Sequence, residues 1–247
     1  MDDLFGTVGT WTSLSDPAVA EIAAGGGFDF VVVDTEHTPL GLESVADCVR
    51  GVEAADGNAV VRVPSNDPVR IKRLLDVGAD GLLVPMVDTA EEAQAAVEAT
   101  RYPPEGGRGV AAARAADYGR TFENYVREGH RSLSVIVQIE SGEAVDNAAD
   151  IAAVEGVDAL FVGPADLSAS LGRFAEWTDA EFLAAIEATV DAAEDAGVPV
   201  GTLGTTPEQI EALGSLGFDY MVAGADFTHL VEGQRRALAA AEDVLSD

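Results

Sequence analysis

Strand-like and helix-like segments alternate from one end of the chain to the other, and this alternation constrains the fold more than any other feature. The expected strands are short runs rich in Val, Ile and Leu without polar alternation, which is typical of strands buried on both faces of a parallel sheet. Helical runs follow them, several opened by Asp-Pro or Thr-Pro steps. The predicted strands are 6–11, 28–34, 58–63, 81–86, 132–140, 159–163, 199–203 and 220–223. The predicted main helices are 18–24, 42–55, 69–77, 89–100, 142–154, 178–196, 207–213 and 228–245, with Thr178 capping the sixth.

Eight strands alternating with eight helices in 247 residues fit a (β/α)8 TIM barrel in the class of α/β proteins. The alternative is an open doubly wound sheet, which usually carries a glycine-rich nucleotide loop after its first strand, and Gly6 and Gly9 do not form one. No linker or shift in composition marks a domain boundary. We therefore predict a single barrel domain that spans residues 1–247.

The charge of the chain excludes several classes of partner. It has 44 acidic and 14 basic residues, a net charge of −30, which repels nucleic acid and anionic membranes. A hydrophobic content of 47% favours a folded protein, so we expect an acidic surface suited to a salt-rich, halophilic cytoplasm, or a merely acidic protein of an ordinary cell. Cys48 is the only cysteine and forms no internal disulfide, and no signal peptide or membrane span is apparent. These features predict a cytoplasmic protein.

Ionisable residues gather where the predicted strands end. In a (β/α)8 barrel the carboxyl ends of the strands meet at one face, and this face carries the chemistry. The strand at 28–34 leads into a carboxylate, a second carboxylate and an imidazole within a few residues. The candidate site residues at this face are Asp34, Glu36, His37, Arg62, Gln138, Glu140 and Asp166.

These residue types together suit enolate chemistry. Two carboxylates, Glu140 and Asp166, without a cysteine or histidine cluster suit a hard divalent cation such as Mg²⁺ or Mn²⁺. Arg62 suits the carboxylate of a 2-oxo acid, and a histidine oriented by an aspartate, His37 with Asp34, suits proton transfer near neutral pH. No lysine ends a predicted strand, which disfavours a Schiff-base mechanism.

Each of these residues also has a structural alternative. Arg62 and Gln138 could form polar contacts inside the barrel. Glu140 could cap the helix that follows Ser141, and Asp166 could cap a short helix over 167–171, because carboxylates favour helix amino termini. The coincidence of all four at one face favours the functional interpretation.

Six ordered motifs resemble a known family. The chain resembles the HpcH/HpaI class II pyruvate aldolases over nearly its whole length. The motifs are Asp34-x-Glu36-His37-x-Pro39, Arg62-x-Pro64-x-Asn66-Asp67-Pro68, Leu83-Val84-Pro85-Met86, Tyr102-Pro103-Pro104 with Gly107-Arg108-Gly109-Val110, Gln138-Ile139-Glu140 and Gly163-Pro164-Ala165-Asp166-Leu167-Ser168.

The resemblance implies a barrel of the phosphoenolpyruvate/pyruvate superfamily that cleaves a 4-hydroxy-2-oxo acid reversibly to pyruvate and an aldehyde. It implies that Glu140 and Asp166 bind a divalent cation, Mg²⁺, Mn²⁺ or Co²⁺. It also implies that His37, oriented by Asp34, acts as acid and base through water, and that Arg62 stabilises the pyruvate enolate.

For the substrate, the resemblance implies that Gln138 contacts pyruvate and that the backbone near Ala165 and Asp166 receives its carboxylate. It further implies a homohexamer or homotrimer in which the final helix, 228–245, is exchanged between subunits. Two other functions compete with the aldolase: a lyase of the malyl-CoA or citramalyl-CoA type, and a non-catalytic carboxylate-binding barrel. The first needs a basic surface for the CoA phosphates, and the second is disfavoured by the presence of His37 and both metal-binding acids.

Overall fold

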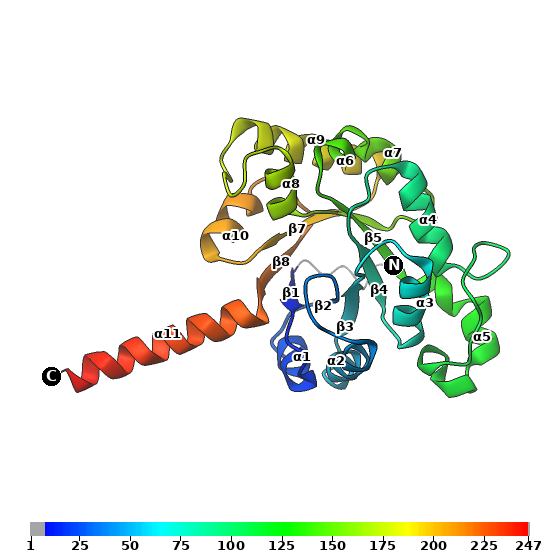
Figure 1. The fold of residues 1–247 in the computed structure, drawn as a ribbon, viewed down its shortest axis with the longest axis horizontal. Helices are drawn as coiled ribbons and strands as arrows, with labels where there is room; N and C mark the ends of the chain where they lie inside the picture. The colour runs from blue at the N-terminus through cyan, green and yellow to red at the C-terminus, as the bar shows by residue number, and fades with distance from the viewer. Residues whose placement is uncertain (1–7, 247) are drawn as a thin grey trace.

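A closed barrel of parallel strands forms the body of the protein, and it confirms the predicted (β/α)8 architecture (Figure 1). The computed structural model describes residues 8–246. The strands neighbour one another in chain order, and β1 closes the barrel by pairing with β8. Gly6 and Thr7 of the predicted first strand lie outside the described residues. The strands are β1 (Val8–Thr12), β2 (Phe30–Asp34), β3 (Asn58–Arg62), β4 (Gly81–Val84), β5 (Ser134–Ile139), β6 (Ala159–Val162), β7 (Val200–Gly204) and β8 (Tyr220–Ala225).

Helices follow the strands around the outside of the barrel. The predicted helix over 142–154 is two helices, α6 and α7, which meet at Asn147. Asp179 rather than Thr178 caps α9, because its carboxylate accepts from the backbone N–H groups of Glu181 and Phe182. The helices are α1 (Pro17–Ala24), α2 (Leu42–Ala54), α3 (Pro68–Asp76), α4 (Ala90–Thr100), η1 (Arg114–Gly119), α5 (Phe122–Arg127), η2 (Gly129–Ser132), α6 (Gly142–Asp146), α7 (Ala148–Ala152), α8 (Pro164–Ser170), α9 (Ala180–Ala196), α10 (Pro207–Gly214) and α11 (Asp226–Leu245).

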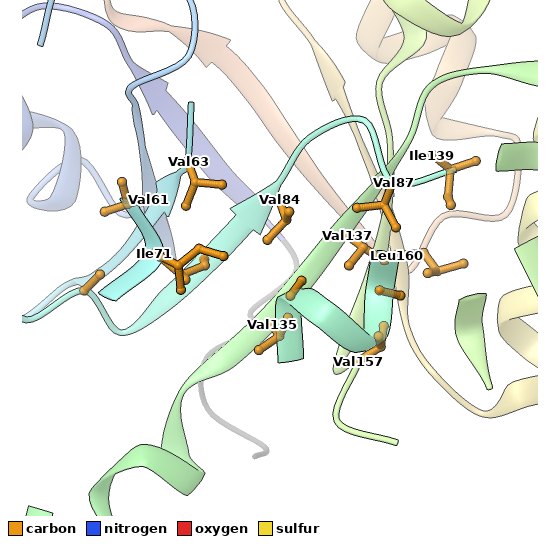
Figure 2. Close-up of a cluster of buried hydrophobic side chains, with 14 of the residues drawn as sticks. Val61, Val63, Ile71, Val84, Val87, Val135, Val137, Ile139, Val157 and Leu160 are labelled. Atoms are coloured by element: carbon orange, nitrogen blue, oxygen red, sulfur yellow. The ribbon is translucent and has the colours of Figure 1, made fainter. Parts of the chain in front are cut away.

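The hydrophobic core has two layers because successive strand side chains point to opposite faces. In β2, Val31 and Val33 belong to the outer layer between the barrel and the helices, whereas Phe30 and Val32 belong to the layer inside the barrel. Figure 2 shows part of the outer layer, with Ile71 of α3 and valines of β3, β4 and β5. Burial on both faces explains the unalternated apolar runs.

The last helix, α11, leaves the barrel and extends away from it (Figure 1). It begins at Asp226, two residues before the predicted start. The Asp226 carboxylate oxygen Oδ2 accepts from Thr12 Oγ1 at 2.6 Å and from the N–H groups of Ser13 and Leu14, both at 2.9 Å. Asp226 therefore ties the root of α11 to the end of β1. No helix within residues 8–246 is long and apolar enough to cross a membrane.

Candidate active site

The two-residue period of the strands brings the predicted polar residues together inside one mouth of the barrel. Val32 of β2 points into the barrel, so Asp34 lies on the same inner face. The same period places Arg62 of β3 and Gln138 of β5 inward at the carboxyl ends of their strands. They face a cavity of about 520 Å³. The predicted site residues that line it are Asp34, His37, Arg62, Gln138, Ala165 and Asp166.

The Arg62 guanidinium is the centre of the charge network at this mouth. Its Nε donates to Asp34 Oδ1 and its Nη2 to Asp34 Oδ2, both at 2.8 Å, which forms a bidentate pair. Its Nη1 lies 2.8 Å from Glu36 Oε2. The strand register explains the first pair, because Asp34 and Arg62 are partners across β2 and β3. A guanidinium carries more N–H donors than these carboxylates use, so donors are left for a ligand in the cavity.

The sequence predicts that Asp34 orients His37, and in the structure the Asp34 carboxylate contacts Arg62 and the Glu36 backbone. Both Asp34 oxygens accept from Arg62, and Asp34 Oδ1 also accepts from the Glu36 backbone N–H at 3.0 Å. His37 Nε2 instead lies 3.9 Å from Glu36 Oε2, and its side chain is 69% exposed. Glu36, to which the sequence assigned no role, therefore lies between Arg62 and His37.

Glu140 is a buried carboxyl group beside the cavity. Its Oε1 accepts from the Met86 N–H at 2.7 Å, and its Oε2 accepts from Gln138 Nε2 at 3.0 Å. Burial raises the pKa of Glu140 to about 7, and the negative charge of Asp166 raises it as well. The absence of a side chain at Gly163 makes room, because a Cβ there would lie 2.6 Å from Glu140 Oε2. The carboxylate thus has a tight, formed pocket.

Neither acid predicted to bind a metal caps a helix. The Ser141 hydroxyl caps α6 by accepting from the Ala144 N–H, so Glu140 does not perform this task. Gly163 occupies the cap position of α8, and Asp166 lies within its first turn. The capping alternative for both acids is therefore wrong, and their carboxylates remain available at the mouth.

The donor set at the mouth fits a hard cation with open positions. Glu140 follows β5 and Asp166 follows β6, and these strands are neighbours in the barrel. Residues 8–246 contain no group of three or more His, Cys, Asp or Glu side chains that could hold a metal ion. A cation here would take the two carboxylates and leave its other positions to water and substrate. Gln138 Oε1 is a buried acceptor without a partner, which a donor in the cavity would satisfy.

The other side of the mouth is apolar, and the sequence did not point to it. Trp11 lies near the carboxyl end of β1 and points into the barrel, so its position in the strand could have indicated that it lines the cavity. Trp177 stands in an aperiodic loop between α8 and α9, so no periodicity or motif indicates it. The apolar and aromatic residues that complete the cavity wall include Trp11, Phe161, Trp177, Leu203, Ala225 and Phe227.

The chain is similar to known proteins over nearly its whole length. The model of the HpcH/HpaI aldolase/citrate lyase family matches residues 7–233. A pyruvate aldolase of Rhizobium etli is 44% identical over 94% of this chain and 91% of that protein. A 5-keto-4-deoxy-D-glucarate aldolase of Shigella dysenteriae is 39% identical over 89% of this chain and 86% of that protein. The crystal structure of an HpcH/HpaI aldolase/citrate lyase family protein from Burkholderia cenocepacia has a TM-score of 0.91 and 37% identity, and covers 96% of this chain and 94% of that chain.

Proposed function

The chain belongs to the HpcH/HpaI aldolase/citrate lyase family, and from this premise we propose how its barrel mouth works. The protein is a carbon–carbon lyase, a metal-dependent aldolase that cleaves a 4-hydroxy-2-oxo acid reversibly to pyruvate and an aldehyde. One observation carries the assignment of residues. A buried arginine that is held bidentately by a strand-end carboxylate faces the same cavity as Asp166 after β6, and Glu140 after β5 is buried beside that cavity, where it accepts a hydrogen bond from the cavity-lining Gln138.

We assign the metal site to Glu140 and Asp166, with Mg²⁺, Mn²⁺ or Co²⁺ as the candidate ions. The tight pocket of Glu140 and the exposed position of Asp166 in the first turn of α8 support this assignment. When bound, a divalent cation supplies a Lewis acid that polarises the 2-oxo group. Because the Glu140 pKa is raised to about 7, this carboxyl must lose its proton before it can act as a ligand near neutral pH.

The pyruvate half of the substrate is held by Arg62 and Gln138 in this proposal. The free N–H donors of Arg62 hydrogen-bond the oxygen at C2, which gains negative charge as the enolate develops. Asp34 fixes the plane of the guanidinium and thus its aim. The backbone near Ala165 and Asp166, at the cavity wall, receives the substrate carboxylate.

His37 moves the proton in this proposal. In cleavage it takes the proton from the hydroxyl at C4, through water, while the C3–C4 bond breaks and its electron pair enters the enolate. The aldehyde leaves, and a proton returned to C3 gives pyruvate. Glu36, rather than Asp34, is the carboxylate that neighbours His37 and links it to Arg62.

We also propose that the protein is a homotrimer or homohexamer that exchanges α11 between subunits, with residues 1–247 forming one barrel domain. The projection of α11 away from its own barrel supports exchange (Figure 1). Its apolar side chains are exposed in one chain, Leu230 at 53%, Leu238 at 61% and Val244 at 76%. Light scattering of the full chain should give a mass of three or six subunits.

The proposed setting is a salt-rich cytoplasm. The net charge of −30 supports a surface that depends on salt to screen its self-repulsion. The thiol of Cys48 is buried and free, which suits a reducing compartment. Melting temperature should rise with KCl concentration, and a flat response would argue against a halophilic surface.

The experiment that tests the function is pyruvate release from a panel of 4-hydroxy-2-oxo acids, with Mg²⁺ or Mn²⁺ at high salt. His37→Ala should lose most activity and still bind metal, whereas Glu140→Ala should lose the metal. Glu143→Ala, an exposed acid just after the site, is the matched control and should change neither. Absence of pyruvate across the panel with metal bound would refute the assignment. Metal loss in His37→Ala would refute the division of roles.

A further inference from the structure

The cavity at the barrel mouth has two unlike sides. Its charged and polar groups come from the ends of β2, β3 and β5 and from α8. The neighbouring strands β7, β8 and β1 form one continuous arc, because β1 pairs with β8. They contribute the apolar side chains of Leu203, Ala225 and Trp11 to the wall, and the segments that follow β1 and β7 add Ser13, Thr205 and Gln209 at its edge. A substrate that places its carboxylate and 2-oxo group on the charged side must extend its other half along the apolar arc.

Trp177 is part of that apolar wall and is held in place from behind. It lies in the loop 171–179 between α8 and α9 and is half-buried. Its ring meets the Phe182 ring edge-on, with centroids 5.8 Å apart and an interplanar angle of 64°. Phe182 is completely buried in the outer core layer. The buried Phe182 ring therefore holds the Trp177 indole in position, while Trp177 also lines the cavity.

The loop that carries Trp177 is tied to the site. The Arg173 N–H donates to the Ser168 carbonyl at 2.7 Å, and the Ala175 N–H donates to Ser168 Oγ at 3.4 Å. Ser168 Oγ in turn donates to the carbonyl of Ala165, beside the proposed substrate carboxylate, at 2.9 Å. Ala175 has a φ of 63°, a left-handed conformation that a residue with a Cβ adopts only when its surroundings impose it. This loop is an ordered part of the site.

We propose that Trp177 determines aldehyde specificity and that the preferred aldehyde carries an uncharged hydrophobic group. This inference rests on the proposed aldolase function. An aromatic wall gains affinity by burying apolar surface, and its edge-on support lowers the entropy lost on binding. A second carboxylate on the aldehyde would instead share the cavity with Asp34 and Asp166. The cation nearest to the arc is Arg62, over the Trp11 ring, and it is already paired with Asp34 and Glu36.

The test uses the full-length enzyme in the aldol addition direction, with pyruvate and either 3-methylbutanal, glycolaldehyde or glyoxylate. We expect wild-type kcat/KM to be highest for 3-methylbutanal. Trp177→Ala should lower kcat/KM for 3-methylbutanal about 10- to 100-fold and for glycolaldehyde less than about twofold, because only the hydrophobic group contacts the indole. Trp177→Phe should retain most of the preference. Phe174→Ala, an aromatic deletion in the same loop at a side chain that is 69% exposed, is the matched control.

A separate readout distinguishes this inference from the proposed function. Exchange of the pyruvate C3 protons for deuterium in D₂O reports enolate formation without any aldehyde, and every variant should retain it. If exchange persists but Trp177→Ala affects all aldehydes equally, or the wild type prefers glyoxylate, the inference is wrong and the aldolase stands. If the wild type shows no metal-dependent exchange, both fail. If Trp177→Ala does not fold, Trp177→Leu replaces it under the same criteria.

Discussion

Two buried arginines, Arg62 and Arg108, have similar surroundings and different roles. Arg62 is 8% exposed and Arg108 is 2% exposed. Each guanidinium lies over an aromatic ring, Arg62 at 4.6 Å from the Trp11 centroid and Arg108 at 4.7 Å from the Tyr102 centroid. Each also pairs with a carboxylate. Burial, an aromatic neighbour and an ion pair therefore do not by themselves indicate a catalytic arginine.

The difference lies in charge balance and in access to a cavity. Arg108 has one acidic partner, Asp76 at 3.0 Å, and its side chain is completely enclosed. Arg62 has two acidic partners, Asp34 and Glu36, and lines a cavity of about 520 Å³. A buried excess of negative charge is costly unless a cation joins it. The site around Arg62 is therefore built for a ligand, whereas the ion pair of Arg108 with Asp76 fastens the segment after α4 to α3.

The largest expected effect is on catalysis at Arg62. Arg62→Lys should lower kcat by roughly 10²–10³-fold, because a lysine cannot hold Asp34 bidentately and aim a second donor at the enolate oxygen. Arg108→Lys should change kcat less than about twofold, since Arg108 is not among the residues that line the cavity. Steady-state kinetics at saturating metal measures both. Equal losses in the two variants would erase the distinction drawn between the arginines.

The next effect is on stability at Arg108. Arg108→Met should lower the free energy of unfolding by about 3 kcal/mol, since it removes the partner of Asp76 and a side chain enclosed by Tyr102 and Tyr125. Asp76→Asn should lower it less, because Asp76 is 21% exposed and water screens part of the pair. Urea unfolding monitored by circular dichroism gives both values. A stability loss below about 1 kcal/mol in Arg108→Met would mean that the pair is not structural.

The sequence predicted the barrel because burial on both faces leaves unalternated valine runs such as 31–33, and because eight such runs alternate with helices along the chain. It also predicted which polar residues meet at the mouth, because a period of two fixes their direction once the strand ends are known. The errors were local. Asn147 interrupts a helical pattern, and the choice between Thr178 and Asp179 as cap depends on backbone angles that a pattern does not contain.

Pairings within the site could not be predicted from the sequence. Which carboxylate faces Arg62 depends on the register between β2 and β3, and this register places Asp34 directly opposite. The Asp34 carboxylate therefore contacts Arg62, and the carboxylate nearest to His37 in the structure is that of Glu36. Trp177 was missed for a related reason. Its position depends on loop contacts to Ser168 and Phe182, and neither contact leaves a periodic trace in the sequence.

A smaller effect is expected at Glu36. This residue is the second acidic partner of Arg62, and Arg108 has only one. Glu36→Gln should lower kcat about 10- to 100-fold with little change in the KM for substrate, because the carboxylate positions Arg62 and neighbours His37 without lining the cavity. Glu36→Asp should recover part of the loss, since it restores the charge. Melting temperature is the control, because a purely structural role would lower stability in step with activity. Unchanged kcat in Glu36→Gln would mean that Glu36 contributes nothing to the action of His37 or Arg62.

The smallest effect concerns the pH dependence of metal binding at the acidic site around Arg62. The Glu140 pKa is raised from 4.5 to about 7 by burial, so in metal-free protein its contribution to stability is complete below pH 4.5 and is lost as pH rises through about 7. Metal needs the ionised form, so apparent metal affinity should fall about tenfold per pH unit below 7. The rise in melting temperature on adding Mn²⁺ should therefore be larger at pH 8 than at pH 6, and Glu140→Gln should abolish it at both. Glu143→Gln, the exposed control, should behave as wild type. A metal effect independent of pH would show that Glu140 is already ionised at pH 6, so that burial does not raise its pKa to about 7.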